Sequence, residues 1–370
     1  ANENDEIVTA SGHGCGHNLL GAGSLGAAIA VKDYMQKRGL KGTIRYYGCP
    51  GEETGSGKMF MARAGLFDDL DAAFTWHGGT QNSITVTHSL ANVCAYFKFK
   101  GRTSHAAGSP HLGRSALDAC ELMNVGCNYL REHILPDERI HYAYTDVGGS
   151  APNVVQDHAC VFYYVRSPRV SQVLDLYERV KDVARGAALM TGTQLEIILN
   201  DGLCDYQPND TLSQLLYDCF VECGGPKFSD AEKQMAADFA KTFDPAAVAD
   251  KARHLAAEYG LVIAEQYKDQ ILVEDILPYH PSDHISPGST DVGDVSYCTP
   301  TAQFNVSTWA LCTTGHTWQV TAQAGSDIGR TGCVKAAEVL ALTTIKAMQD
   351  PALLQKAKEE WKRTTGGKYI

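Results

Sequence analysis

The chain has 370 residues, of which 44% are hydrophobic and 20% are charged. This length and composition are typical of a globular protein with a large core and two domains. A formal net charge of -11 argues against nucleic acid as the main partner. No apolar run approaches the roughly 20 residues that are needed to cross a bilayer, so a membrane partner is not expected either.

Twelve cysteines are scattered along the chain, and several lie in apolar stretches such as "ANVCAYF" and "HACVFYYV". Cysteine in such a context behaves as a small hydrophobic residue. A chain of this length does not need a disulfide framework, and its start shows no signal-peptide pattern. We therefore expect reduced cysteines and a cytoplasmic protein.

From residue 18 to about residue 88 the chain alternates between helix and strand patterns. We expect helices at 20–39 and 57–65, and buried strands at 42–48 and 71–77. Strands that alternate with helices favour parallel pairing in an α/β sheet. In such sheets ligands gather beyond the carboxyl ends of the strands.

Between residues 89 and 204 the order changes. We expect strands at 92–101, 139–148, 158–167 and 194–201, and helices at 113–134 and 171–192. Four strands with two helices indicate an α+β unit, an open sheet with both helices on one face.

After residue 204 the chain becomes helical and polar, as in 229–243, before an apolar strand pattern at 301–313 and a last helix at 334–348. The simplest architecture is a discontinuous α/β domain, 1–88 and 205–370, with an α+β domain, 89–204, inserted into it.

Near the start, "SGHGCGHN" places His13, Cys15 and His17 at alternate positions. Neutral imidazole and thiolate are both good ligands for zinc-like metals. A histidine beside a cysteine can also lower the pKa of the thiol and activate it as a nucleophile. These three residues alone leave both interpretations open, together with a loop of no chemical role.

Glu52 and Glu53 follow the strand expected at 42–48, in the glycine-rich "GCPGEETGSG". An isolated pair of glutamates is most often a solvated acidic turn. Its place at the carboxyl end of an expected strand favours a ligand site instead. One carboxylate would then bind metal while the other faces a bound water, as metal-assisted hydrolysis requires.

His77 ends the next expected strand in "FTWHGG", and His316 follows an apolar stretch in "ALCTTGHTWQ". A lone histidine at either place is more often structural. Together with Cys15, His17 and Glu53, however, both lie in loops that a parallel sheet brings to one rim. Five such ligands exceed what one catalytic zinc needs and suit two metals that share a ligand.

The order of the motifs resembles the aminoacylase/carboxypeptidase family of dinuclear metallopeptidases, peptidase family M20. The motifs are "GHGCGHN", "PGEETGSGK", "FTWHGG", "GRTSHAAGSP", "GGSAPNVVQD", "GSTDVGDVS" and "GHTWQ", so the resemblance runs from about Ser11 to the end. It is greatest to the amidohydrolase branch, which contains the B subunits of aminobenzoyl-glutamate hydrolases. The resemblance implies a zinc-peptidase-like catalytic domain with a mainly parallel sheet, and an inserted ferredoxin-like lid or dimerisation domain.

The resemblance also implies a ligand set for two divalent ions, zinc or manganese. Cys15 matches the bridging position, and His17, Glu53, His77 and His316 match the terminal ligand positions.

The remaining roles follow from the same resemblance. Glu52 matches the general base, and His105 in "TSHAA" matches the histidine of the inserted domain that stabilises the oxyanion in the partner subunit's site. Asn153 and Arg166 match the pair that grips the substrate's carboxylate, a task that suits the fork of an arginine. His13 is expected to be a bystander.

Other positions depart from the family pattern or leave two interpretations open. Asn18 stands where many relatives have aspartate. The family's upstream strand, which ends in a "DALP"-type aspartate, does not precede Ser11, so we expect the N-terminal part of the catalytic domain to be missing from this chain. Asp291 and Asp294 in "GSTDVGDVS" are expected either to support ligating histidines or to cap a helix.

The main hypothesis is a metal-dependent amidohydrolase that cleaves N-acyl amino acids such as aminobenzoyl-glutamate, or dipeptide-like amides with a free carboxylate. We expect a homodimer through the inserted domain, or a complex with a sister subunit. Two alternatives stay open. One is a cysteine-nucleophile hydrolase that uses Cys15 and His17, and the other is a non-catalytic or partner-dependent subunit of the same fold.

Overall fold

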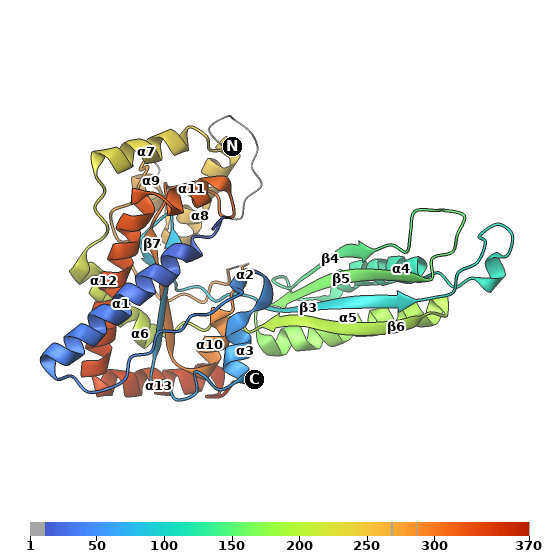
Figure 1. The fold of residues 1–370 in the computed structure, drawn as a ribbon, viewed down its shortest axis with the longest axis horizontal. Helices are drawn as coiled ribbons and strands as arrows, with labels where there is room; N and C mark the ends of the chain where they lie inside the picture. The colour runs from blue at the N-terminus through green and yellow to red at the C-terminus, as the bar shows by residue number, and fades with distance from the viewer. Residues whose placement is uncertain (1–11, 268, 287, 370) are drawn as a thin grey trace.

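The computed structural model describes residues 12–267, 269–286 and 288–369. In Figure 1 these residues form a rounded unit and a long arm that extends from it. The arm consists of residues 91–203. The globular unit contains the other described residues, which lie on both sides of the arm in the sequence.

A small sheet of three strands, in the order β1-β7-β2, lies within the globular unit. β1 (Ala73–Gly79) and β7 (Thr301–Ser307) are parallel, with His77 opposite Asn305. The short β2 (Ser83–Ile84) is antiparallel to β7. The longer pair is therefore parallel, as the alternating pattern predicts, and the sheet as a whole is mixed.

Helices surround this sheet, and apolar residues of α1, α6 and α12 join Trp76 and Phe304 in one core. The helices of the globular unit are α1 (His17–Arg38), α2 (Glu52–Gly55), α3 (Gly57–Arg63), α6 (Asp210–Cys223), α7 (Asp230–Ala240), α8 (Pro245–Tyr259), α9 (Leu261–Tyr267), α10 (Val292–Cys298), α11 (Trp318–Ala324), α12 (Asp327–Gln349) and α13 (Pro351–Thr365). Over the described parts of both units, no helix has the length and apolar character needed to cross a membrane.

Small residues let α1 lie close to the sheet. A Cβ atom added to Gly23 would lie 2.8 Å from the ring of Trp76, and Trp76 Nε1 donates to the carbonyl of Leu20 at 3.1 Å. The helix ends at Arg38 because Gly39 takes the left-handed conformation with φ of 68°. This is the end that the sequence predicts.

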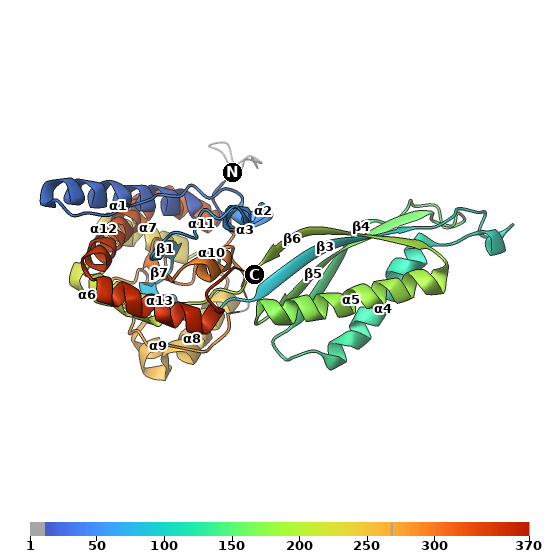
Figure 2. The same ribbon diagram turned by 90° about the horizontal axis from the view of Figure 1, so that it is seen from below.

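The arm is an α+β unit in the chain order β3-α4-β4-β5-α5-β6, with an antiparallel sheet in the order β4-β5-β3-β6. This is the ferredoxin-like arrangement, and both helices lie on one face of the sheet (Figure 2). The elements are β3 (Ala91–Lys100), η1 (Pro110–Leu112), α4 (Ala116–Leu130), η2 (Arg131–His133), β4 (Arg139–Asp146), β5 (His158–Ser167), α5 (Val170–Thr191) and β6 (Gln194–Leu203).

Alternation along β5 separates the two faces of the arm's sheet. Val161, Tyr163 and Val165 are fully buried in the core that α4 and α5 share with the strands. Phe162 and Tyr164 point to the other face, which carries no helix. This is the helix-free face of the arm's sheet.

Two of the expected strands differ from the structure. Residues 42–48 are not a strand, and the strand expected at 301–313 ends at Ser307. A strand needs a neighbour for its backbone hydrogen bonds, and within the described ranges no strand pairs with 42–48. Side chains hold this segment instead, since Tyr46 Oη donates to the carbonyl of Gly21 at 3.2 Å and Arg45 pairs with Asp69.

Candidate active site

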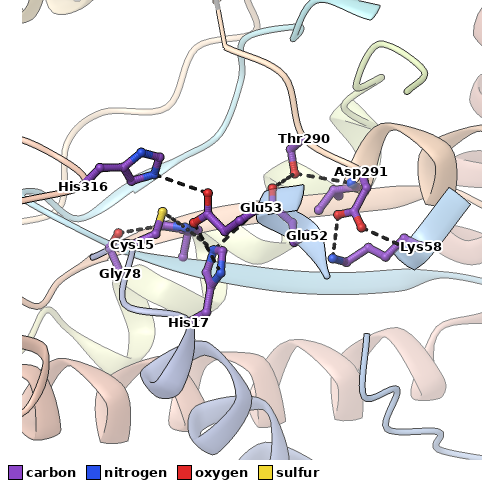
Figure 3. Close-up of polar contacts among 11 residues, drawn as sticks. Cys15, His17, Glu52, Glu53, Lys58, Gly78, Thr290, Asp291 and His316 are labelled. Carbon is purple, nitrogen blue, oxygen red and sulfur yellow. Dashed lines mark hydrogen bonds and ion pairs between the residues drawn. The ribbon is translucent and has the colours of Figure 1, made fainter. Parts of the chain in front are cut away.

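The expected metal ligands come from separate parts of the globular unit and meet at one place (Figure 3). Cys15 and His17 lie at the start of α1, and His77 lies in β1. Glu53 is in the first turn of α2, and His316 lies in the loop between β7 and α11. Glu52 is next to this group.

The possible ligand atoms of these residues lie close enough together to bind the same metal ion. The distances are 3.4 Å from Cys15 Sγ to His77 Nε2, 3.4 Å from His77 Nε2 to His17 Nε2, 3.7 Å from His17 Nδ1 to Glu53 Oε1, and 3.6 Å from His316 Nε2 to Glu53 Oε2. Three sets, Cys15–His17–His77, Cys15–Glu53–His316 and His17–Glu52–Glu53, each have three ligand atoms within 4.8 Å of one another. Cys15, His17 and Glu53 each belong to two of these sets, so the ligand atoms form one continuous group.

Glycines of "GHGCGH" allow the ligand loops to approach each other. A Cβ atom on Gly14 would lie 3.3 Å from the backbone of His316, whose N–H donates to the carbonyl of Gly14 at 2.9 Å. Gly16 takes a φ of 74° and lies against the ring of Trp309. The side chain of His13 is exposed and lies outside the ligand sets.

His77 is oriented by its own chain. Its Nδ1–H donates to the carbonyl of Gly78 at 2.7 Å, and burial lowers the pKa of the ring. A neutral imidazole whose Nδ1–H is held by a carbonyl presents Nε2 as a ligand atom. Nε2 is the atom that faces Cys15 and His17.

The surroundings of Cys15 favour a metal ligand over a nucleophile. Burial raises the pKa of its thiol to about 12, and the carboxylates of Glu53 and Glu52 act in the same direction. A thiol with such a pKa stays protonated at neutral pH and is a poor nucleophile. A bound cation reverses that preference, because metals bind the thiolate form.

The two adjacent glutamates have different surroundings. Glu53 faces His17 and His316, whereas Glu52 Oε1 accepts a hydrogen bond from Thr290 Oγ1 at 3.2 Å (Figure 3). Burial and the nearby carboxylate of Asp291 raise the pKa of Glu52. Different environments for paired carboxylates allow one to hold a cation while the other moves a proton.

His105 and Asn153 lie together on the arm, away from this group. The backbone of His105 pairs with Val154, and the N–H of Ala106 donates to the carbonyl of Asn153 at 2.9 Å. Their loops adjoin the ends of β3 and β5 that are far from the globular unit (Figure 1). Since His105 Nδ1 accepts the N–H of Gly108 at 2.9 Å, the neutral ring carries its proton on Nε2 and is a donor there.

Arg166 lies at the opposite end of β5 from Asn153. It is on the helix-free face, with its guanidinium 5.8 Å from the ring centroid of Tyr164. The strand between His158 and Arg166 spans more than about 25 Å at 3.3 Å per residue. A single chain therefore brings neither His105 to the ligand group nor Asn153 to Arg166.

The family model described as peptidase family M20/M25/M40 matches residues 6–270 of this chain. The chain belongs to this family. Membership in the M20 family confirms the predicted fold class and the prediction of a hydrolase that acts on amide bonds.

Two M20 relatives match nearly the whole chain. It is 44% identical over 358 residues to the B subunit of p-aminobenzoyl-glutamate hydrolase from Escherichia coli K12, covering 96% of this chain and 74% of that protein. It is 29% identical over 364 residues to the Xaa-Arg dipeptidase of Mus musculus, covering 96% and 72%.

Solved structures share the fold. A putative aminohydrolase from methicillin-resistant Staphylococcus aureus has a TM-score of 0.62 at 14% identity, covering 91% of this chain and 74% of that one. An aminobenzoyl-glutamate utilization protein from Klebsiella pneumoniae has a TM-score of 0.52 at 18% identity, covering 85% and 66%.

Two residues that the sequence analysis did not connect with the glutamates, Thr290 and Asp291, hold the turn that carries them. Asp291 is fully buried and accepts both the backbone N–H of Lys58, at 3.0 Å, and its Nζ, at 2.7 Å. Thr290 binds Glu52. The one available signal is an aspartate in the mainly apolar "TDVGDVSY", because a buried charge requires a partner.

The expectation for Asp291 and Asp294 holds only for the position of Asp291 at the start of α10. Asp291 has the N-cap position of α10, but its side chain makes no capping hydrogen bond. Asp294 lies inside α10 and accepts from Tyr369 Oη at 2.7 Å and from the N–H of Cys204 at 3.4 Å. Both carboxylates are used to join separate segments of the chain.

Proposed function

We propose that this chain is a metal-dependent amidohydrolase that cleaves N-acyl amino acids of the aminobenzoyl-glutamate type. The observation that carries the proposal is the convergence of the five expected ligands beside Glu52. The name of the 44% identical relative, a p-aminobenzoyl-glutamate hydrolase, supports this substrate class. The name Xaa-Arg dipeptidase supports dipeptide-like amides as the second candidate.

The ligand group suits two divalent ions, zinc or manganese. Its donors are thiolate, imidazole and carboxylate, which these metals accept, and Cys15 belongs to two of its three sets of ligand atoms. When bound, the ions polarise the amide carbonyl and make the attacking water easier to ionise.

In this mechanism Glu52 moves the proton. It takes a proton from the attacking water as the new C–O bond forms, and it passes that proton to the amide nitrogen as the C–N bond breaks. The products are a carboxylic acid and an amino acid with a free amine. The half-buried position of Glu52 raises the pKa of its carboxyl group, which helps it to hold the proton between the two steps.

We also propose that residues 89–204 form an inserted lid and dimerisation domain. Asn153 and Arg166 lie at opposite ends of β5 in one chain. In a dimer they can act at the same site, because each chain contributes one of them. His105 of the partner subunit would donate its Nε2–H to the oxyanion. Arg166 and Asn153 of the partner subunit would then bind the substrate's carboxylate.

A second candidate is a protein that works only with a sister chain. The 44% identical relative is one of the subunits of its enzyme. The chain is also 31% identical over 191 residues to the A subunit of p-aminobenzoyl-glutamate hydrolase from Escherichia coli K12. Turnover by the purified chain without a second protein would exclude this candidate.

The main test is hydrolysis of p-aminobenzoyl-glutamate by the metal-loaded chain, measured as the release of p-aminobenzoate. The Glu52→Gln protein should keep its metal and lose about 10²–10⁴-fold in kcat, the usual effect of a general base. Glu338→Gln, on the exposed side of α12, is the matched control and should be unchanged. A Glu52→Gln protein with both metals and full turnover would overturn the assignment.

Two reagents separate this mechanism from the cysteine-nucleophile alternative. A chelator should abolish activity, and zinc or manganese should restore it. Iodoacetamide should leave the metal-loaded enzyme active, since Cys15 is then a ligand. The opposite pattern, inactivation by iodoacetamide with indifference to the chelator, would support the alternative.

A further inference from the structure

We propose that Asp201 of the arm is a positioning residue that holds Glu52 in place by means of Ser56. The inference rests on the proposed role of Glu52 as the general base. It adds a residue from a different unit of the molecule, more than a hundred positions away in the sequence, to the residues that support the reaction.

The turn that carries the glutamates cannot support itself. α2 has only four residues and lies between Gly51 and Ser56, which both take left-handed conformations with φ of 73° and 48°. Isolated helices shorter than about 12 residues are marginal in water, and positive φ is uncommon for a residue with a side chain. The position of Glu52 must therefore be set by contacts from outside the turn.

Such contacts come from both units of the molecule. From the globular unit, Thr290 binds Glu52 and Asp291 binds Lys58. From the arm, Asp201 Oδ1 accepts a hydrogen bond from Ser56 Oγ at 2.7 Å, and Ser56 is only 2% exposed. The Ser56–Asp201 bond thus ties the end of the turn to strand β6.

A bulge in the arm's sheet gives Asp201 this direction. Opposite β3, Leu199 pairs with Ala95 and Asp201 pairs with Cys94, so one extra residue of β6 lies between the two pairs. In a regular strand, residues two positions apart share a face, so Asp201 would lie on the same face as Leu199 and its partner Ala95, which is the face that the helices cover. The bulge moves Asp201 to the helix-free face.

Arg166 shares that face with Asp201. Cys94, which is opposite Asp201, is also opposite Tyr164, and Tyr164 is two residues from Arg166 on the same strand. The helix-free face therefore carries Arg166, the proposed carboxylate-binding residue, and also Asp201, which holds the turn of Glu52. A shift of the arm would move Arg166 and this turn together, so the position of the substrate would be coupled to the position of Glu52.

Kinetics of four variants test the proposal. Ser56→Ala and Asp201→Ala in the metal-loaded enzyme should each lower kcat by about 10- to 100-fold, as small misplacements of catalytic groups do. KM and metal content should change by less than about 3-fold, since neither residue is expected to touch substrate or metal. Asp201→Asn keeps an oxygen that accepts from Ser56 and should retain near wild-type kcat. The Ser56→Ala/Asp201→Ala double variant should be no slower than either single variant, because both remove the same bond.

A second readout does not depend on activity. In the metal-free protein, amide hydrogens of the segment 50–58 should exchange faster in Ser56→Ala and Asp201→Ala than in the wild type, because the turn opens more readily. Thr211→Val is the matched control, since Thr211 Oγ1 donates to Glu360 at 2.6 Å between two helices remote from the turn in sequence. It should leave both kcat and this exchange unchanged.

The outcomes separate this inference from the proposed function. If Glu52→Gln abolishes turnover while Ser56→Ala and Asp201→Ala stay within 2-fold of wild type, the positioning role is wrong and the base assignment stands. An Asp201→Asn protein as slow as Asp201→Ala would also overturn it. If Glu52→Gln is fully active, the proposed function fails first.

Discussion

Asp291 and Asp294 lie three positions apart in one motif, and the protein uses their charges in different ways. Asp291 is fully buried and paired with Lys58, whose side chain is only 16% exposed. Asp294 accepts hydrogen bonds from neutral groups, and its burial raises the pKa of the carboxyl group to about 6. The contribution of Asp291 to stability thus depends on its ion pair with Lys58, and that of Asp294 depends on pH.

The Lys58→Met substitution tests the ion pair. It leaves Asp291 as an unpaired buried charge, so we expect a loss of about 3–5 kcal/mol in the free energy of unfolding, measured with urea. The double variant Lys58→Met/Asp291→Asn removes both charges and should recover most of that loss. Equal instability of the single and double variants would contradict this account.

The raised pKa of Asp294 makes a prediction about pH. Between its ordinary pKa of 3.8 and about 6, the folded protein binds more protons than the unfolded chain. The contribution of this group to stability is therefore present below about pH 4 and is lost as the pH rises through about 6.

Tyr369→Phe removes the hydrogen bond to the charged form of Asp294. It should destabilise the protein by about 1–3 kcal/mol at pH 8 and by less at pH 5, where the folded carboxyl group is protonated. Thermal unfolding at both pH values measures the difference. Tyr129→Phe, at a ring that is 73% exposed, is the control and should change neither value.

At the scale of elements, sequence pattern predicts what local chemistry determines. The end of α1 at Gly39 follows from a left-handed cap, and the strands of the arm follow from alternation. The pattern fails at 42–48, where strand-forming residues have no pairing partner among the described strands. It also does not show the bulge that turns Asp201 toward Ser56, because a bulge belongs to the register of two strands and not to either sequence alone.

The packing of α1 predicts opposite effects for two similar substitutions. Gly21→Ala meets nothing closer than 3.7 Å and should stabilise the protein by about 0.5–1 kcal/mol, the helix propensity gained. Gly23→Ala would place its Cβ 2.8 Å from Trp76 and should destabilise the protein by about 1–3 kcal/mol despite the same gain. Urea unfolding of both variants gives the comparison, and two changes of the same sign would show that α1 is not packed as described.

At the scale of the whole molecule, Cys15, His17, Glu53, His77 and His316 are expected together because they lie in loops that a parallel sheet brings to one rim. The residues of the arm were named from the family resemblance, and their distance from this group appears only in the fold. β5 carries Arg166 near the globular unit and directs the loop of Asn153 to the far end. No local pattern encodes that separation.

Mixing two inactive variants tests whether the arm works between subunits. Glu52→Gln and His105→Ala should each be inactive alone, but a dimer with one chain of each type has one complete site. After random exchange of subunits, activity should return to about a quarter of the wild-type value, since half of the dimers are mixed and each has one intact site of two. No recovery in a mixture shown to contain mixed dimers would place His105 in its own chain's site.

The chain leaves the globular unit in β3 and returns in β6, and these two strands are direct neighbours with Asn92 opposite Leu203. The entry and exit points of the arm are thus separated by about 5 Å, the spacing of paired strands. In evolutionary terms such an insertion is inexpensive, because a tight turn of a few residues bridges the same gap. A lineage can therefore lengthen, shorten or exchange the arm while the ligand group of the globular unit keeps its place.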